Sequence, residues 1–175
     1  TAGALSTARG INTLFNAFEK LSRNKNSLSL IVAGQLDQRL SIPASDKVRY
    51  LGELPHHDIG LLFYALDVGV ICNRRTQFAE YCFPQKFYEM VACRLPMVAA
   101  DVGVMPRLLA RYEHSLYEPE NADSLAKAIE IQLDRRIVVN GSIPTWRDCG
   151  EDFHQLLEEA LKTSRAVKPS GMVRK

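Results

Sequence analysis

A lysine and a glutamate three residues apart are the first candidates for chemistry in this chain. Lys86 and Glu89 follow Pro84, and the apolar pattern after them predicts that both lie in the first turns of a helix. The start of a helix offers unpaired N–H groups and a positive dipole end, which favour phosphate, and Lys86 would add a positive charge there. The carboxylate of Glu89 can accept hydrogen bonds from two neighbouring hydroxyls. The same spacing fits a local surface ion pair, so spacing alone leaves both interpretations open.

Alternating strands and helices are predicted to position these side chains. Short apolar runs rich in Val, Ile and Leu predict strands at 28–33, 48–51, 68–72 and 97–100. Helical patterns are predicted at 11–23, 57–66, 85–93, 122–135 and 145–163, with a short helix after Pro106 and Asn121 as an N-cap. Because the strands are apolar on both faces, the fold class is α/β, a Rossmann-like parallel β-sheet flanked by helices on both faces.

Ligands of such folds bind beyond the carboxyl ends of the strands, where the strand order reverses. The residues that directly follow the predicted strands are Gly3, Gly34, Gly52 and Asn73. The chain has no G-x-G-x-x-G and no G-x-x-x-x-G-K-[ST], so a conventional dinucleotide loop or P-loop is unsupported. A Ser-His-Asp arrangement cannot be justified by spacing either.

The segment around the lysine and the glutamate resembles glycosyltransferase family 4 (glycosyl transferases group 1), whose members have the two-domain GT-B fold. In Phe83–Ala100, FPQKFYEMVACRLPMVAA, Glu89 and the turn Leu95-Pro96-Met97-Val98 fit the family pattern, with Arg94 where glycine is usual. Pro84-Gln85-Lys86 looks like a P-x-K variant found in bacterial polysaccharide enzymes of this family. The opening residues, Gly3-Ala4-Leu5 followed by Arg9-Gly10-Ile11, resemble the family's glycine loop and its basic residue before glycine.

This resemblance implies a binding site for a nucleotide sugar. Glu89 would accept hydrogen bonds from the ribose, Arg9 and Lys86 would bind the diphosphate, and backbone near Leu54 would contact the base. Gly3, which has no Cβ, would let the backbone approach the phosphates or the sugar. The implied donor-binding residues are Gly3, Leu54, Asn73, Phe83, Pro84 and Glu89, and those implied to act in catalysis are Arg9, Lys86 and Glu80.

Two positions depart from the family pattern. The family often has a second glutamate near the donor sugar, but the matching position here holds Tyr81, and Glu80 is one residue away. A small loop shift would let Glu80 serve, or Asn73 and backbone groups hold the sugar instead. Arg107 replaces the acidic residue that is usual after Pro106.

Length and composition bound the interpretation. The chain has 175 residues, which fits one domain, expected at 1–163 with a flexible tail at 164–175. Its net charge of +2, from 22 basic and 20 acidic residues, is too balanced to indicate nucleic acid as a partner. Its four cysteines form no C-x-x-C pair and have no histidine at metal-ligand spacing, so we expect free or buried thiols in a reducing compartment.

The resemblance runs from Gly3 to about Leu161 but covers only the second half of the family's architecture. The chain also opens without Met on what resembles the end of a strand, so we expect a fragment of a longer enzyme that lacks its N-terminal acceptor-binding domain. The implied enzyme is a retaining, hexosyltransferase-like glycosyltransferase of bacterial polysaccharide or glycoconjugate synthesis. It would use a UDP- or GDP-sugar as substrate without a cofactor or metal, and the isolated domain would be inactive.

The expected location is the cytoplasm, with attachment to the inner face of the membrane through the missing domain, and a membrane-linked acceptor, as further options. Two other classes stay open. One is an epimerase-like enzyme acting on nucleotide sugars, against which the P-x-K-x-x-E spacing argues. The other is a non-catalytic nucleotide-sugar-binding module, which the tyrosine at position 81 keeps open.

Overall fold

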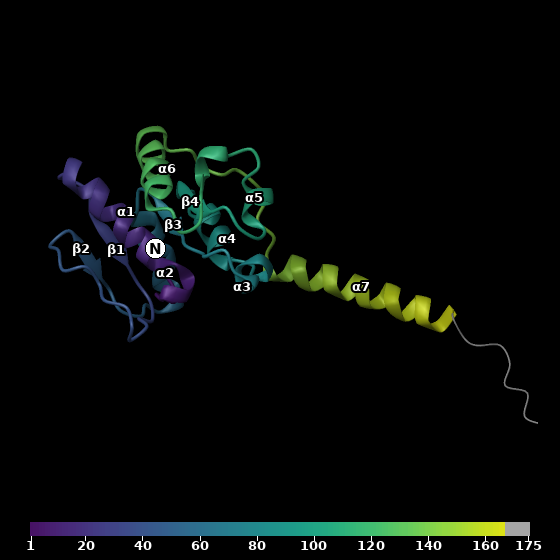
Figure 1. Ribbon diagram of the computed structural model, residues 1–175. Coiled ribbons are helices and arrows are strands. Elements are labelled where there is room, and N and C mark those ends of the chain that lie inside the picture. Colours follow the sequence, from purple (N-terminus) through teal and green to yellow (C-terminus); the bar gives the residue numbers. More distant parts are fainter. Residues whose placement is uncertain (167–175) are drawn as a thin grey trace, which may run out of the picture. The chain divides into compact units, whose positions relative to one another are not determined.

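The computed structural model describes residues 1–166, and its chain divides into two units, Thr1–Gly141 and Ser142–Lys175 (Figure 1). The first unit contains all the strands that the structure describes and six of its α-helices. The second contains α7 (Trp146–Ala166). The helix continues past residue 163, where we expected a flexible tail to begin, and the rest of that predicted tail, 167–175, lies outside the described residues.

All strands of the first unit run parallel. β1 (Leu30–Val32) pairs with β2 (Val48–Tyr50), and β4 (Met97–Ala100) lies between β3 (Gly69–Ile71) and β5 (Leu116–Tyr117). The segment Thr1–Leu5, here called the N-terminal segment, lies between these two sheets. It forms parallel bridges to the β1 side, Ala2 with Ala33 and Leu5 with Leu36. On its other side the Thr1 hydroxyl donates to the Val70 carbonyl oxygen of β3 at 2.6 Å.

The resulting spatial order is β2, β1, N-terminal segment, β3, β4, β5. The chain first builds outward through β1 and β2 and then returns to the other side of the N-terminal segment with β3. The strand order therefore reverses between the N-terminal segment and β3. In parallel α/β folds this reversal opens a crevice at the carboxyl ends of the strands.

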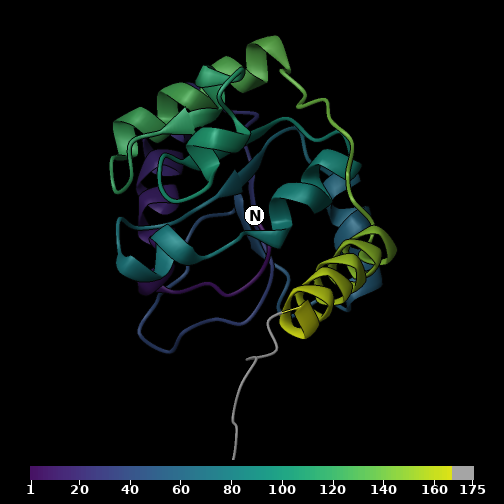
Figure 2. The same ribbon diagram turned by 90° about the vertical axis from the view of Figure 1, so that its right-hand side faces the viewer.

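Helices cover both faces of this strand layer (Figure 2). On one face, α1 (Ile11–Asn24) packs against α6 (Ala122–Arg135), and both share a core with Val70 and Val98. The other face carries α2 (His56–Ala65) and α4 (Gln85–Ala92). There Gly69 lies so close to Met90 of α4 that a Cβ would meet its sulfur at 2.7 Å. The predicted Rossmann-like architecture is thus confirmed.

Local sequence accounts for the start of α6. The predicted N-cap of α6 is confirmed, since the Asn121 side chain accepts hydrogen bonds from the N–H groups of Asp123 and Ser124, both at 3.0 Å. The predicted helix after Pro106 is wrong in its start. α5 (Met105–Leu108) contains Pro106 in its first turn, where the missing N–H costs no helical hydrogen bond.

Several short elements were not predicted. They are α3 (Gln77–Tyr81), two 3₁₀ turns at Thr7–Arg9 and Glu113–Ser115, and β5. Elements of two to five residues are too short to show a hydrophobic period. α3 begins at a side-chain cap, because the Thr76 hydroxyl oxygen accepts from the Ala79 N–H at 3.3 Å.

The second unit is described by itself. The side chains of α7 are exposed over 146–163, and its apolar ones, Trp146, Phe153, Leu156, Leu157 and Leu161, recur at helical spacing. Among the helices of residues 1–166, none combines the length and the apolar character needed to cross a membrane.

Candidate functional site

A lysine lies directly against the glycine of the N-terminal segment. Gly3 has a φ of +109°, and a Cβ at this position would overlap the Nζ and Cε atoms of Lys86. Only glycine adopts this φ freely, so both the backbone conformation and the space for the lysine depend on glycine here. Lys86 is the second residue of α4, which begins after Pro84. The lysine ammonium therefore lies against the N-terminal segment, next to the place where the strand order reverses.

An arginine from the neighbouring loop lies beside this lysine. Arg9 ends the 3₁₀ turn that leads into α1, and its guanidinium carbon lies 4.5 Å from the centre of the Phe78 ring. Its Nη1 donates to the Cys82 sulfur at 3.6 Å. Phe78 belongs to α3 and Cys82 directly follows that helix. The turn that carries Arg9 therefore meets a segment that is far away in the sequence.

The two cations repel each other, and burial strengthens the effect. The pKa of Lys86 is lowered, first because the half-buried ammonium loses solvation and second because the positive charge of Arg9 is near; Glu89 opposes these effects only in part. Among the side chains that the structure describes, no carboxylate forms an ion pair with Arg9 or Lys86. A half-buried pair of cations without a carboxylate is suited to binding an anion.

The glutamate three residues after the lysine does not neutralise it. Lys86 and Glu89 share α4, but they form no ion pair within the described part of the chain. The carboxylate is half-buried and near enough to raise the pKa of Lys86 slightly against the larger effects. The local surface pair that the spacing allowed is therefore absent from the described structure.

The structure places the remaining donor-binding residues predicted from the sequence at different distances along the chain from this pair. Asn73 follows β3, is buried with 5% exposure, and its backbone lies against Gly10, directly after Arg9. Pro84 is the N-cap residue of α4. Phe83 is exposed and stacks on Tyr88 with ring centres 5.3 Å apart. Leu54 lies in the loop between β2 and α2, two strands away from the N-terminal segment, and no contact in the described structure joins it to the two cations.

Glu80 is not brought together with the two cations. It lies in α3 with an exposed side chain, and no hydrogen bond or ion pair in residues 1–166 connects its carboxylate with Arg9 or Lys86. Tyr81, at the position where the family pattern has glutamate, is 89% exposed. The assignment of Glu80 to catalysis therefore gains no support from the geometry.

Two contacts of the site were missed from the sequence, those of Phe78 and Cys82 with Arg9. Both residues come from a segment without a helical period, and the Arg9–Cys82 contact joins positions 73 residues apart in the sequence. The only available indication was their position between β3 and α4, the connection that must cross the carboxyl end of the strand layer.

Comparison with known proteins agrees with this architecture. Residues 1–140 match the family model described as glycosyl transferases group 1. The chain is 27% identical over 127 residues to TuaC of Bacillus subtilis (strain 168), named as a teichuronic acid biosynthesis glycosyltransferase, and the match covers 73% of this chain and 30% of TuaC. The chain therefore spans about a third of the length of that relative.

Three solved structures share the fold. The C-terminal domain of a glycosyl transferase group 1 family protein (LpcC) from Francisella tularensis has a TM-score of 0.62 at 15% identity, covering 77% of this chain and 73% of that one. Anabaena Alr3699/HepE in complex with UDP has a TM-score of 0.60 at 22% identity, covering 77% and 39%. Sucrose-phosphate synthase from Thermosynechococcus elongatus has a TM-score of 0.68 at 19% identity, covering 93% and 45%.

The family model covers residues 1–140, which is most of the chain, and the solved structures share its fold. The chain therefore belongs to the glycosyl transferases group 1 family.

Proposed function

We propose that this chain binds the nucleotide-sugar donor of a retaining, metal-independent glycosyltransferase. The observation that carries the proposal is the pair Arg9 and Lys86, which lies beside Gly3 at the reversal of the strand order and has no carboxylate partner among the described side chains. A diphosphate carries the negative charge that would neutralise these two cations. The start of α4 adds N–H groups and a positive dipole end to the same place.

In the proposed reaction, the bond between the sugar and the diphosphate breaks and negative charge builds up on the departing nucleoside diphosphate. Arg9 and Lys86 stabilise that charge. Glu89 accepts hydrogen bonds from the ribose hydroxyls and fixes the nucleoside. Retention of configuration follows from delivery of the acceptor on the front face, arranged by a further domain.

The relatives support particular choices of donor and product. HepE was solved in complexes with UDP and with UDP-glucose, and TuaC is named for teichuronic acid biosynthesis. We therefore propose a UDP-sugar, with a GDP-sugar as the second choice, and a role in bacterial polysaccharide synthesis. A cytoplasmic location agrees with this, because Cys72, Cys82, Cys93 and Cys149 are all free thiols.

The acceptor site belongs to another part of the enzyme in this proposal. The chain covers 39% of HepE and 30% of TuaC, so most of each relative has no counterpart here. We propose that the isolated chain binds donor but transfers no sugar, and that the acceptor, including any membrane-linked one, is bound elsewhere.

Calorimetric titration of the 175-residue chain with UDP, GDP, NAD and ATP tests the proposal. Tighter binding of UDP or GDP than of NAD or ATP is expected. Binding of NAD without binding of either nucleoside diphosphate would overturn it. Robust transfer from a UDP-sugar by this chain alone would overturn the assignment of the acceptor site to another domain.

A non-catalytic binding module is the second candidate. Tyr81 stands at the position of the family's sugar-side glutamate, and Glu80 has no described contact with Arg9 or Lys86. A module would bind UDP equally well, but the full-length protein would show no transfer with any acceptor extract. Transfer by the full-length protein excludes the module.

A further inference from the structure

The connection between β3 and α4 reaches across the candidate site and contacts Arg9 at two points. The guanidinium carbon lies over the Phe78 ring, 4.5 Å from its centre, and the Cys82 sulfur accepts from one of the terminal nitrogens. A sulfur is a weak acceptor, and an aromatic face uses no N–H group at all. Most of the guanidinium's N–H donors therefore stay free to bind oxygen atoms of a ligand.

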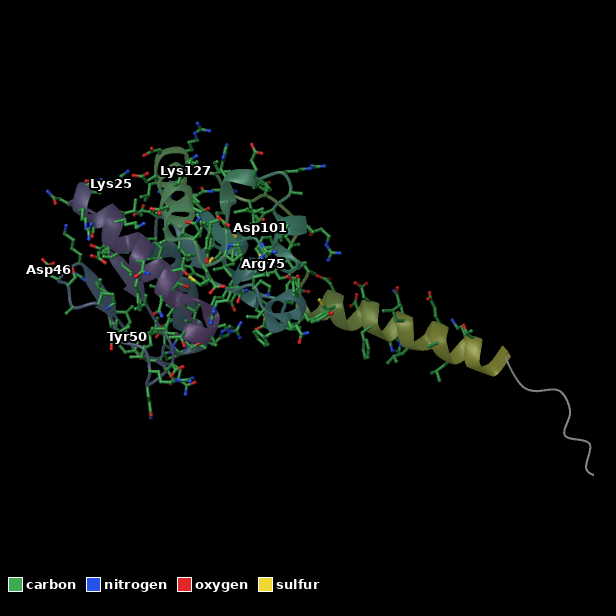
Figure 3. All side chains as sticks on the ribbon, viewed as in Figure 1. Lys25, Asp46, Tyr50, Arg75, Asp101 and Lys127 are labelled. Atoms are coloured by element: carbon green, nitrogen blue, oxygen red, sulfur yellow. The ribbon has the colours of Figure 1, made fainter. Side chains whose placement is uncertain are left out.

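α3 itself is held against the loop that follows β4. Gly103, with a φ of +63°, lies so close to α3 that a Cβ would overlap the Ala79 carbonyl oxygen. Arg75 donates from Nη2 to the Asp101 carbonyl oxygen at 3.1 Å, and Figure 3 shows the two residues side by side. With the Thr76 cap, these contacts hold the short helix at its N-terminal end and at its middle, although it is too short to be stable alone.

Contacts of this kind reduce the conformational entropy that Arg9 loses when it binds a phosphate. An unsupported arginine side chain samples many rotamers, and it loses this freedom when it binds a ligand. Phe78 and Cys82 restrict Arg9 before any ligand arrives. The Phe78 side chain is still accessible to solvent, with 58% exposure.

We propose that Phe78 is a positioning residue that holds the Arg9 guanidinium ready for the diphosphate. Phe78 acts on the affinity for the diphosphate through Arg9 and makes no contact with the nucleoside. This inference rests on the proposed function, because it takes a diphosphate as the ligand of Arg9.

A double-mutant cycle on the 175-residue chain tests the proposal, with UDP and inorganic pyrophosphate as probes. Phe78→Leu should weaken the binding of both by about two- to five-fold, the range expected for losing one cation–π contact at an exposed site. Phe78→Tyr keeps an aromatic face and should restore the affinity. In the Arg9→Gln background, Phe78→Leu should have no further effect.

Tyr81→Leu is the matched control. It removes an aromatic ring from the same helix, and no contact with Arg9 is present among the described side chains. Its affinity for both probes should equal that of the wild type.

The outcomes separate the two proposals. If the wild type binds UDP and Phe78→Leu binds it equally well, the inference fails alone. If Phe78→Leu weakens binding equally in the wild type and in Arg9→Gln, Phe78 has only a structural role and the inference also fails. If the wild type binds neither probe, the proposed function fails and the inference falls with it.

Discussion

Replacing Lys86 with methionine should make the protein more stable and a poorer binder at the same time. The ammonium is half-buried between Gly3 and Arg9, and its lowered pKa shows that the fold disfavours the charged form. Methionine keeps a long, flexible side chain without the charge. The substitution therefore removes an electrostatic cost from the folded state. It also removes the positive charge that would bind the ligand.

The sign of the stability effect follows from proton binding. Between the lowered pKa and the ordinary value of 10.5, the folded protein holds fewer protons than the unfolded chain, so the cost of Lys86 is relieved as the pH rises through that window. Below the lowered pKa the cost is fully present. Lys86→Met should accordingly raise Tm at neutral pH, and the difference from the wild type should shrink as the pH approaches 10.5.

The loss of affinity can be estimated from hydrogen bonding to charged groups. One such hydrogen bond contributes about 1.5–3 kcal/mol, which corresponds to roughly 10- to 150-fold in Kd. Calorimetry with UDP and thermal melts of the ligand-free protein measure the two effects. Lys127→Met is the control. It removes an exposed lysine of α6, which is distant in the sequence from Lys86, and it should change neither Tm nor the affinity for UDP.

A Lys86→Met protein that melts lower than the wild type and binds UDP equally well would refute the reasoning. That result would mean that the ammonium packs favourably and faces no ligand. A lower Tm with weakened binding would contradict the electrostatic argument but leave the site assignment intact.

Three further predictions use the same assays. Glu89→Gln should weaken UDP binding about ten-fold or more with little change in Tm, because it removes the charge that accepts from the ribose; equal affinity would falsify that assignment. Gly3→Ala should lower both Tm and affinity, since a Cβ at φ +109° overlaps Lys86, and an unchanged Tm would contradict the described packing. Gln132→Leu should cost about 1–3 kcal/mol in unfolding by denaturant while leaving UDP affinity unchanged, because its buried amide bonds Ser115 at 2.7 Å and the Ile137 N–H at 3.0 Å. An affinity loss in Gln132→Leu would show that stability and binding are not separable here.

The sequence predicted the layers of this fold because the elements that build them are long or strongly patterned. α1 and α6 show a clear helical period, and β4 was predicted at its observed bounds. β5 was missed because two residues cannot show alternation, although Tyr117 in it is almost fully buried. The sequence also could not show that the N-terminal segment lies at the centre of the layer, since that depends on pairing with residues far along the chain.

The candidate site was predicted in part. Lys86, Arg9 and Gly3 were singled out from motifs, and the structure brings the three together. The distance between Lys86 and Glu89 was left open by their spacing, because side-chain direction decides it and spacing does not. Phe78 was missed because a five-residue helix held by Gly103 has no pattern of its own.

The position of the N-terminal segment has a consequence for aggregation of the protein. Thr1–Leu5 separates β1 from β3, and each of these strands has its other edge already paired. If the segment detaches, two inner strand edges with unpaired N–H and C=O groups open in the middle of the layer. Such edges can pair with strands of other molecules, so detachment of this segment from its neighbours would lead to aggregation.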